Sequence, residues 1–178
     1  LHEGGILNAN PARSVYPVEA ASPLPDVLFR NEMEDIRRKA AELAIHPEDP
    51  DPRPALLLTL FLDLGLRLGE ARRLKVTDID TSNRLRPVVH VRYDQQRHRA
   101  KRRRLVGPPD LVRLLELYLE AYPPADGSTE LFPWSRRRLQ QVVEALGERA
   151  GIQRKITPSK LRWTYALLAW KAGVTEER

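Results

Sequence analysis

Two arginines in apolar surroundings are the residues most able to do chemistry in this chain. Arg67 follows an apolar stretch within the segment GLRLGE (65–70), and Arg162 lies in an apolar helical pattern near the end of the chain. A guanidinium in such surroundings is costly unless an anion meets it, and its fork of donors suits phosphate. We therefore expect the two side chains to clamp one phosphate at a basic surface. The alternative is structural: an ion pair of Arg67 with Glu70 or Asp63, and a buried salt bridge of Arg162.

A dense basic run lies on a predicted β-hairpin and is a second candidate site. So high a charge density needs a counter-charge, and nucleic-acid phosphates supply one. We expect the run to contact nucleic acid; the alternative is a solvated basic surface. The residues concerned are Arg97, Arg99, Lys101, Arg102, Arg103 and Arg104.

Three further arginines, Arg136, Arg137 and Arg138, occupy the first turn of a helix predicted over 136–149 and capped by Ser135. Exposed cations there oppose the helix dipole at ~0.3–1 kcal/mol each. We expect them to face an external anion, or else to lie on a plain solvent face. The tryptophans Trp163 and Trp170 are not interleaved with the basic run, so we expect them in the core.

The composition narrows the class of protein. The 178 residues carry a net charge of +6, with 24 Arg against 6 Lys. Without cysteine there is no disulfide, thiolate metal site or thiol nucleophile, and the four histidines do not show a metal-ligand spacing. The longest apolar run, 55–66, is too short to span a bilayer, and the N-terminus lacks the layout of a signal peptide. We predict a cytoplasmic protein without cofactor, metal or membrane partner.

The hydrophobic pattern predicts a mostly helical α+β fold with a small three-stranded antiparallel sheet. Residues 1–28, which include four prolines, are predicted to be a linker or the end of an upstream DNA-binding domain. Residues 29–178 form the main domain. Helices are predicted over about 31–44, 54–66, 69–74 and 136–149, and another opens at 108–110 and includes Tyr118. The last helix begins at Pro158 or Ser159 and ends near Gly173, and strands are predicted over 79–80, 88–93 and 102–106.

Two segments resemble the catalytic boxes of the tyrosine recombinases, the phage-integrase type. In residues 57–80 an apolar helix is followed by LGLRLGE and then DID, which is similar to the first box. In residues 156–174, SKLRWTYA followed by AGV is similar to the second box, whose pattern is His-x-Leu-Arg-His-Thr-(Phe/Tyr)-Ala. Asn10-Pro11-Ala12 is similar to the hinge between the family's two domains, so the resemblance covers nearly the whole chain.

The resemblance implies DNA strand cleavage and rejoining in site-specific recombination, or DNA integration, through a phosphotyrosine intermediate. Arg67 and Arg162 match the two arginines that hold the phosphate oxygens. The hairpin lysine that protonates the leaving 5′ oxygen corresponds to Lys101 or Arg99, and Ser159 stands where the second box has histidine. Lys160 beside it is expected to compensate in part and to contact DNA. The implied partner is double-stranded DNA in the nucleoid, with self-association to a tetramer.

One departure affects the expected activity. The family's third box and its nucleophilic tyrosine lie beyond the point that corresponds to Arg178, and Tyr165 is at a packing position of the second box. We therefore expect residues 29–178 to lack the C-terminal part of the catalytic domain, and the chain to bind DNA without cleaving it. Two alternatives stay open: a degenerate, non-catalytic integrase-like DNA-binding protein, and a basic helical RNA-binding or scaffold protein.

Overall fold

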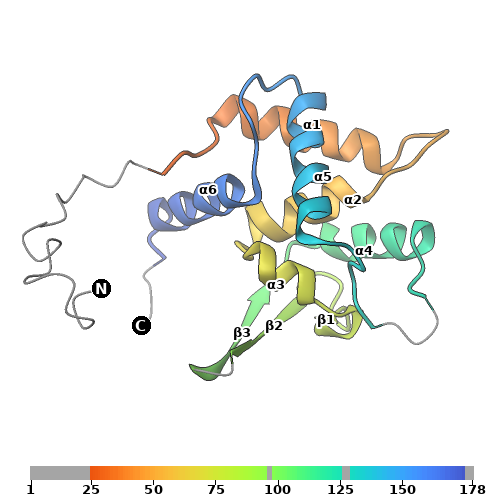
Figure 1. Ribbon diagram of the computed structural model, residues 1–178, viewed down its shortest axis with the longest axis vertical. Coiled ribbons are helices and arrows are strands. Elements are labelled where there is room, and N and C mark those ends of the chain that lie inside the picture. Colours follow the sequence, from red (N-terminus) through yellow and green to blue (C-terminus); the bar gives the residue numbers. More distant parts are fainter. Residues whose placement is uncertain (1–24, 96–97, 126–128, 175–178) are drawn as a thin grey trace, which may run out of the picture.

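The computed structural model describes residues 25–95, 98–125 and 129–174 (Figure 1). It confirms a mostly helical α+β fold with a three-stranded antiparallel sheet. Of the predicted linker, residues 1–24 lie outside this description, so the boundary near residue 28 stays a prediction. The elements are α1 (Arg30–Ala44), α2 (Arg53–Leu58), η2 (Thr59–Asp63), α3 (Leu68–Arg73), η3 (Val76–Asp78), β1 (Ile79–Asp80), β2 (Val88–Gln95), β3 (His98–Val106), α4 (Asp110–Ala121), α5 (Arg136–Arg149) and α6 (Pro158–Lys171).

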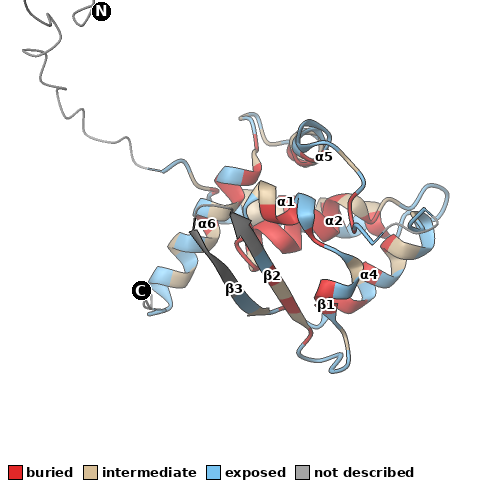
Figure 2. Cartoon of the chain, turned by 60° about the horizontal axis from the view of Figure 1, so that its bottom comes forward, coloured by how far each residue is buried: buried red, intermediate tan, exposed pale blue. Residues whose placement is uncertain are grey.

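The core forms around the most apolar segment of the chain. The helix predicted over 54–66 is divided: α2 continues directly into η2, a turn of π-helix that ends at Asp63. Nearly every side chain of α2 and η2 is buried, because α1, α4 and α5 pack around α2 and α6 packs on η2 (Figures 1 and 2). None of the helices in the described part of the chain is long and apolar enough to cross a membrane.

The sheet has the strand order β1-β2-β3, and both neighbouring pairs are antiparallel. The predicted alternation is present in β2, where Val89 and Val91 are buried and His90 between them is only half-buried. β3 begins at His98, four residues earlier than predicted, because its backbone pairs with β2 almost to the hairpin tip. The basic run therefore lies mostly on a regular strand.

The prediction that Trp163 and Trp170 pack in the core is wrong. The two residues are 48% and 73% exposed, and Figure 2 shows much of the α6 surface as exposed. The sequence of α6 is apolar nearly all round, so its pattern did not reveal that the described part of the chain covers only one side of it. Trp134 instead packs with aromatic residues, namely Tyr118, Tyr122 and Phe132.

The buried hydroxyl of Tyr118 should make the free energy of unfolding depend on pH in the alkaline range. Its hydroxyl donates to the Leu131 carbonyl at 2.7 Å, and burial raises its pKa from 10.0 to about 12. Between these values the unfolded chain loses the phenolic proton and the folded chain keeps it. Stability that is fully present below pH 10 is then lost as the pH approaches 12, by up to about 2–3 kcal/mol. Urea unfolding of wild type and Tyr118→Phe across this range should show the extra pH slope in the wild type alone; equal slopes would contradict the assignment.

Candidate phosphate-binding site

The position of Arg67 is set by a sharp turn where η2 ends. Gly65 has φ +62°, a conformation that glycine adopts without strain, and the Tyr165 ring occupies the space where a Cβ would lie. The chain then extends, so that Arg67 becomes the N-cap residue of α3 with an exposed side chain. The turn therefore aims Arg67 outward although the segment before it is buried.

Arg162 reaches the same turn from α6. Its side chain is half-buried, and its Nε donates to the Gly65 carbonyl at 3.0 Å. Burial lowers the pKa of Arg162, and the positive charge of Arg67 lowers it further. Such a lowering means that the two guanidinium groups are close enough to repel, so an anion between them would be stabilising.

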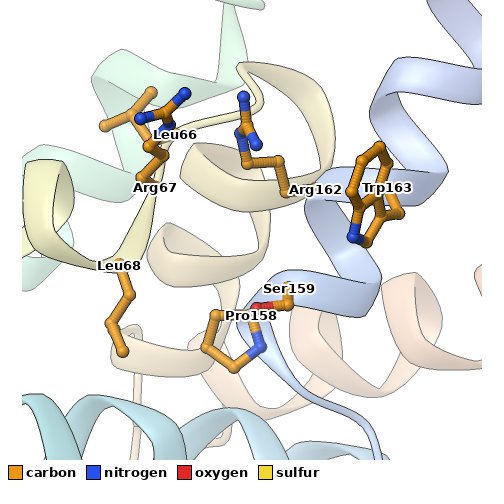
Figure 3. Close-up of a pocket in the computed structure, with 7 residues that line it drawn as sticks. All are labelled: Leu66, Arg67, Leu68, Pro158, Ser159, Arg162 and Trp163. Carbon is orange, nitrogen blue, oxygen red and sulfur yellow. The ribbon is translucent and has the colours of Figure 1, made fainter. Parts of the chain in front are cut away.

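The two arginines line one pocket of about 230 Å³. Figure 3 shows both guanidinium groups directed to the same side of it, with Ser159 and Trp163 on the α6 wall. Neither arginine forms an ion pair with a carboxylate among the described residues. The structural alternative for Arg67 therefore does not hold, since Asp63 pairs with Arg37 and Glu70 pairs with Arg103.

Glu70 holds the backbone of Arg67 and the side chain of Arg103 in place. It was not among the predicted site residues. Its side chain is 4% exposed, and its Oε2 accepts hydrogen bonds from the Arg67 amide at 2.7 Å and from Arg103 Nη2 at 2.8 Å. One buried carboxylate thus fixes the backbone of Arg67 and ties β3 to α3. The signal in the sequence was its place three residues after Arg67, where a carboxylate can cap a helix.

The charges around the pocket favour an anion. Arg67, Arg103 and Glu70 all act electrostatically on Arg162, so that two cations and one carboxylate influence its guanidinium. Glu70 is already engaged by Arg103. The charge of Arg67 and Arg162 is left to be met by something from solution, and a phosphate group has the size and the acceptors for this.

Known proteins resemble this chain in sequence and in fold. Residues 27–175 match the model of the phage integrase family. The chain belongs to this family. It is 30% identical over 120 residues to the tyrosine recombinase XerA of Saccharolobus solfataricus. The aligned residues are 67% of this chain and 37% of XerA.

Solved structures of tyrosine recombinases share the fold. A crystal structure of XerA recombinase matches 89% of this chain and 54% of its own, with a TM-score of 0.68 and 24% identity. A post-cleavage complex of the XerH recombinase with a palindromic difH substrate matches 90% of this chain and 47% of its own, with a TM-score of 0.69 and 22% identity. The chain thus spans about half the length of these relatives, or less.

Lys160 does not lie where the resemblance to the phage integrase family led us to expect it. The side chain is buried, and its Nζ donates to Asp26 at 2.7 Å and to the Lys155 carbonyl at 2.8 Å. Lys160 is not among the residues that line the pocket, whereas its neighbour Ser159 is. Because its ammonium is buried and paired, Lys160 is not placed to contact DNA or to compensate for the family histidine. The reason is helical geometry, because adjacent residues are about 100° apart around a helix.

The remaining predicted residues are spread over neighbouring elements. Arg99, Lys101 and Arg102 lie in β3 by their backbone, and Arg97 lies outside the described residues. Arg104 is exposed, as are Arg136, Arg137 and Arg138 in the first turn of α5, where Ser135 accepts from the Arg138 amide as predicted. The Arg136 guanidinium lies against Gly69 of α3, which brings that turn close to the pocket. Their roles stay predictions.

Arg103 should act in the fold more than on DNA. Replacing it with alanine would leave the Glu70 charge buried without its cation, so we expect a loss of about 1–3 kcal/mol in the free energy of unfolding. Arg104→Ala, the adjacent exposed cation, is the control and should change stability little. In Glu70→Gln the Arg103→Ala change should cost clearly less. Equal costs in both backgrounds, measured by urea unfolding, would show that the pair is not coupled.

Proposed function

We propose that this chain supplies the phosphate-binding part of a tyrosine recombinase active site, which acts in DNA strand cleavage and rejoining. The observation that carries the proposal is the shared pocket, which Arg67 and Arg162 both line without a carboxylate partner among the described residues. The ligand would be one phosphodiester of double-stranded DNA. Each arginine would hold a non-bridging oxygen and stabilise the charge that develops at phosphorus.

The proposed reaction is attack of a tyrosine hydroxyl on this phosphorus. The tyrosine hydroxyl gives its proton to solvent as the phosphotyrosine bond forms, and the bond from phosphorus to the 5′ oxygen breaks. That oxygen takes a proton from the hairpin, from Lys101 or Arg99. No tyrosine is among the described residues that line the pocket, and Tyr165 packs its ring on Gly65. The attacking tyrosine would therefore come from elsewhere, and residues 1–178 alone should bind DNA without forming a covalent adduct.

A second candidate, DNA binding without cleavage, is favoured by Ser159. It lines the pocket at the position of the family histidine, but its hydroxyl is a poor proton acceptor compared with imidazole. An RNA-binding or scaffold role is less well supported, because the relatives include recombinases whose structures are complexes with difH substrate. Assembly of several copies on DNA is also proposed, and sedimentation with and without duplex tests it.

The phosphate site can be tested without catalysis. Arginine Nε–H resonances of ¹⁵N-labelled protein would be followed by NMR during titration with dimethyl phosphate and with duplex DNA, and Arg67→Lys and Arg162→Lys would assign the two signals. We expect both signals to shift together and to saturate at one ligand concentration. Shifts in the basic hairpin alone, with these two signals unmoved, would overturn the proposed site.

The hairpin should supply general affinity for DNA. Changing Arg102 and Arg104 to alanine should weaken duplex binding and lower the slope of log affinity against log salt by about 1.8, since each lost phosphate contact removes roughly 0.9. The charge-matched control changes Arg38 on α1 and Arg113 on α4, both exposed. Fluorescence anisotropy at several salt concentrations measures the slopes. An equal change in both double variants would mean that only net charge matters.

A further inference from the structure

The helix that carries Arg162 is also held on its opposite side. The segment 25–29, here called the entry segment, contacts α6 before α1 begins. The Leu28 amide donates to Thr164 Oγ1 at 2.9 Å in a buried site, and Thr164 Oγ1 donates to the Lys160 carbonyl at 2.8 Å. The buried ammonium of Lys160 pairs with Asp26, with 2.7 Å between Nζ and Oδ2. These contacts of Asp26, Leu28, Lys160 and Thr164 form what we call the α6 arm.

A second set of contacts, made by Arg154, holds the same segment and shares Asp26 with the α6 arm. Arg154, in the loop between α5 and α6, donates to Asp26 and to the Val27 carbonyl, both at 2.5 Å, and pairs with Glu32 of α1. Its guanidinium also lies 4.7 Å from the centre of the Phe29 ring. We call this set the Arg154 arm. It fastens the entry segment to the loop, whereas the α6 arm fastens it to the helix itself.

The α6 arm and the phosphate pocket use opposite sides of the same two helical turns. Lys160 and Thr164, four residues apart, face the entry segment, while Ser159, Arg162 and Trp163 line the pocket. Arg162 lies two residues from each member of the arm, which is about 200° around the helix. On its own side Arg162 is fixed by the Gly65 carbonyl. Its position therefore depends on a helix held between the Gly65 turn and the entry segment.

We propose that Asp26, Lys160 and Thr164 are positioning residues for Arg162. A buried ammonium keeps its place only while its acceptors do, because an unpaired buried charge is strongly destabilising. Loss of the arm would let these turns of α6 shift or roll, and a helix moves as a unit. A displacement of about 1 Å is enough to spoil a guanidinium–phosphate contact. The expected effect on phosphate binding rests on the proposed function. The position of Arg162 itself can be measured without any ligand.

The test compares variants of the two arms in the full chain. Thr164→Val keeps the shape of the side chain and removes the hydroxyl that accepts from Leu28, and Thr164→Ser restores that hydroxyl. Glu32→Gln weakens the Arg154 arm and is the matched control. The readouts are the Nε–H resonance of Arg162 without ligand, the affinity for dimethyl phosphate, and the free energy of unfolding in urea.

We expect Thr164→Val to shift or broaden the Arg162 resonance and to weaken phosphate binding at least threefold, with Thr164→Ser close to wild type. Glu32→Gln should lower stability but leave the resonance in place. If Thr164→Val lowers stability and leaves the resonance unmoved, the arm is only structural and the inference fails. Lys160→Met, which removes the ammonium of the α6 arm and leaves every contact of Arg154 in place, gives the same test should Thr164→Val not fold. Failure of the wild type to bind phosphate would instead count against the proposed function, because the unliganded resonance still reports the arm.

Discussion

Replacing Arg162 or Arg67 by alanine should lower the rate of covalent adduct formation with DNA by about 10²–10³ for each arginine. The reason is that each supplies a preorganised donor for charge that develops at the phosphate, and losing one such donor typically has this cost. The measurement uses a form of the protein that forms the adduct. A duplex nicked near the cleavage point traps the adduct, which a denaturing gel then separates from free protein.

DNA binding is the control that separates catalysis from affinity. Most affinity should come from the many other cations, so both alanine variants should bind the duplex within a few fold of the unmodified protein. Arg104→Ala should show the reverse pattern, with weaker binding and a nearly unchanged rate on saturated substrate. A covalent band of full intensity from Arg162→Ala would remove the proposed role of the pocket. A band from residues 1–178 alone would show that the nucleophile lies within this chain.

Gly65→Ala should be among the most destabilising single substitutions, with a loss of about 2–4 kcal/mol in the free energy of unfolding. The residue has φ +62°, and an added Cβ would overlap the Tyr165 ring. Because the Gly65 carbonyl also accepts from Arg162, relief of the overlap would displace the wall of the phosphate pocket. We expect weaker binding of dimethyl phosphate in addition to lower stability.

Gly151→Ala provides the matched control for backbone strain. Gly151 has φ +77°, but nothing lies within 4 Å of the position that its Cβ would take. It should therefore cost only about 1–2 kcal/mol, the strain of a left-handed conformation. The difference between the two variants in urea unfolding measures the overlap with Tyr165. Equal losses would mean that the ring moves away freely and that the turn does not hold α6.

The sequence was sufficient for features that depend on local pattern. Alternation of Val89 and Val91 with His90 is a property of one strand, and Ser135 caps a helix within its own turn. The pairing of Arg67 with Arg162 came from two boxes whose order along the chain fits a known family. Each of these conclusions needed only neighbouring residues or a motif, and the structure agrees with the placement that they imply.

Tertiary structure alone decided which partner each charged or aromatic side chain meets. Arg103 and Arg104 are neighbours in the basic run and both are exposed, yet of the two only Arg103 pairs with a carboxylate of the described residues, the buried Glu70 of α3. Lys160 adjoins Ser159 but turns to Asp26, and Trp163 is exposed on an apolar helix. Burial and ion pairing depend on what other elements place opposite a side chain. Local sequence therefore determined the elements and the pair of arginines, and the packing of distant elements determined the pocket that unites them.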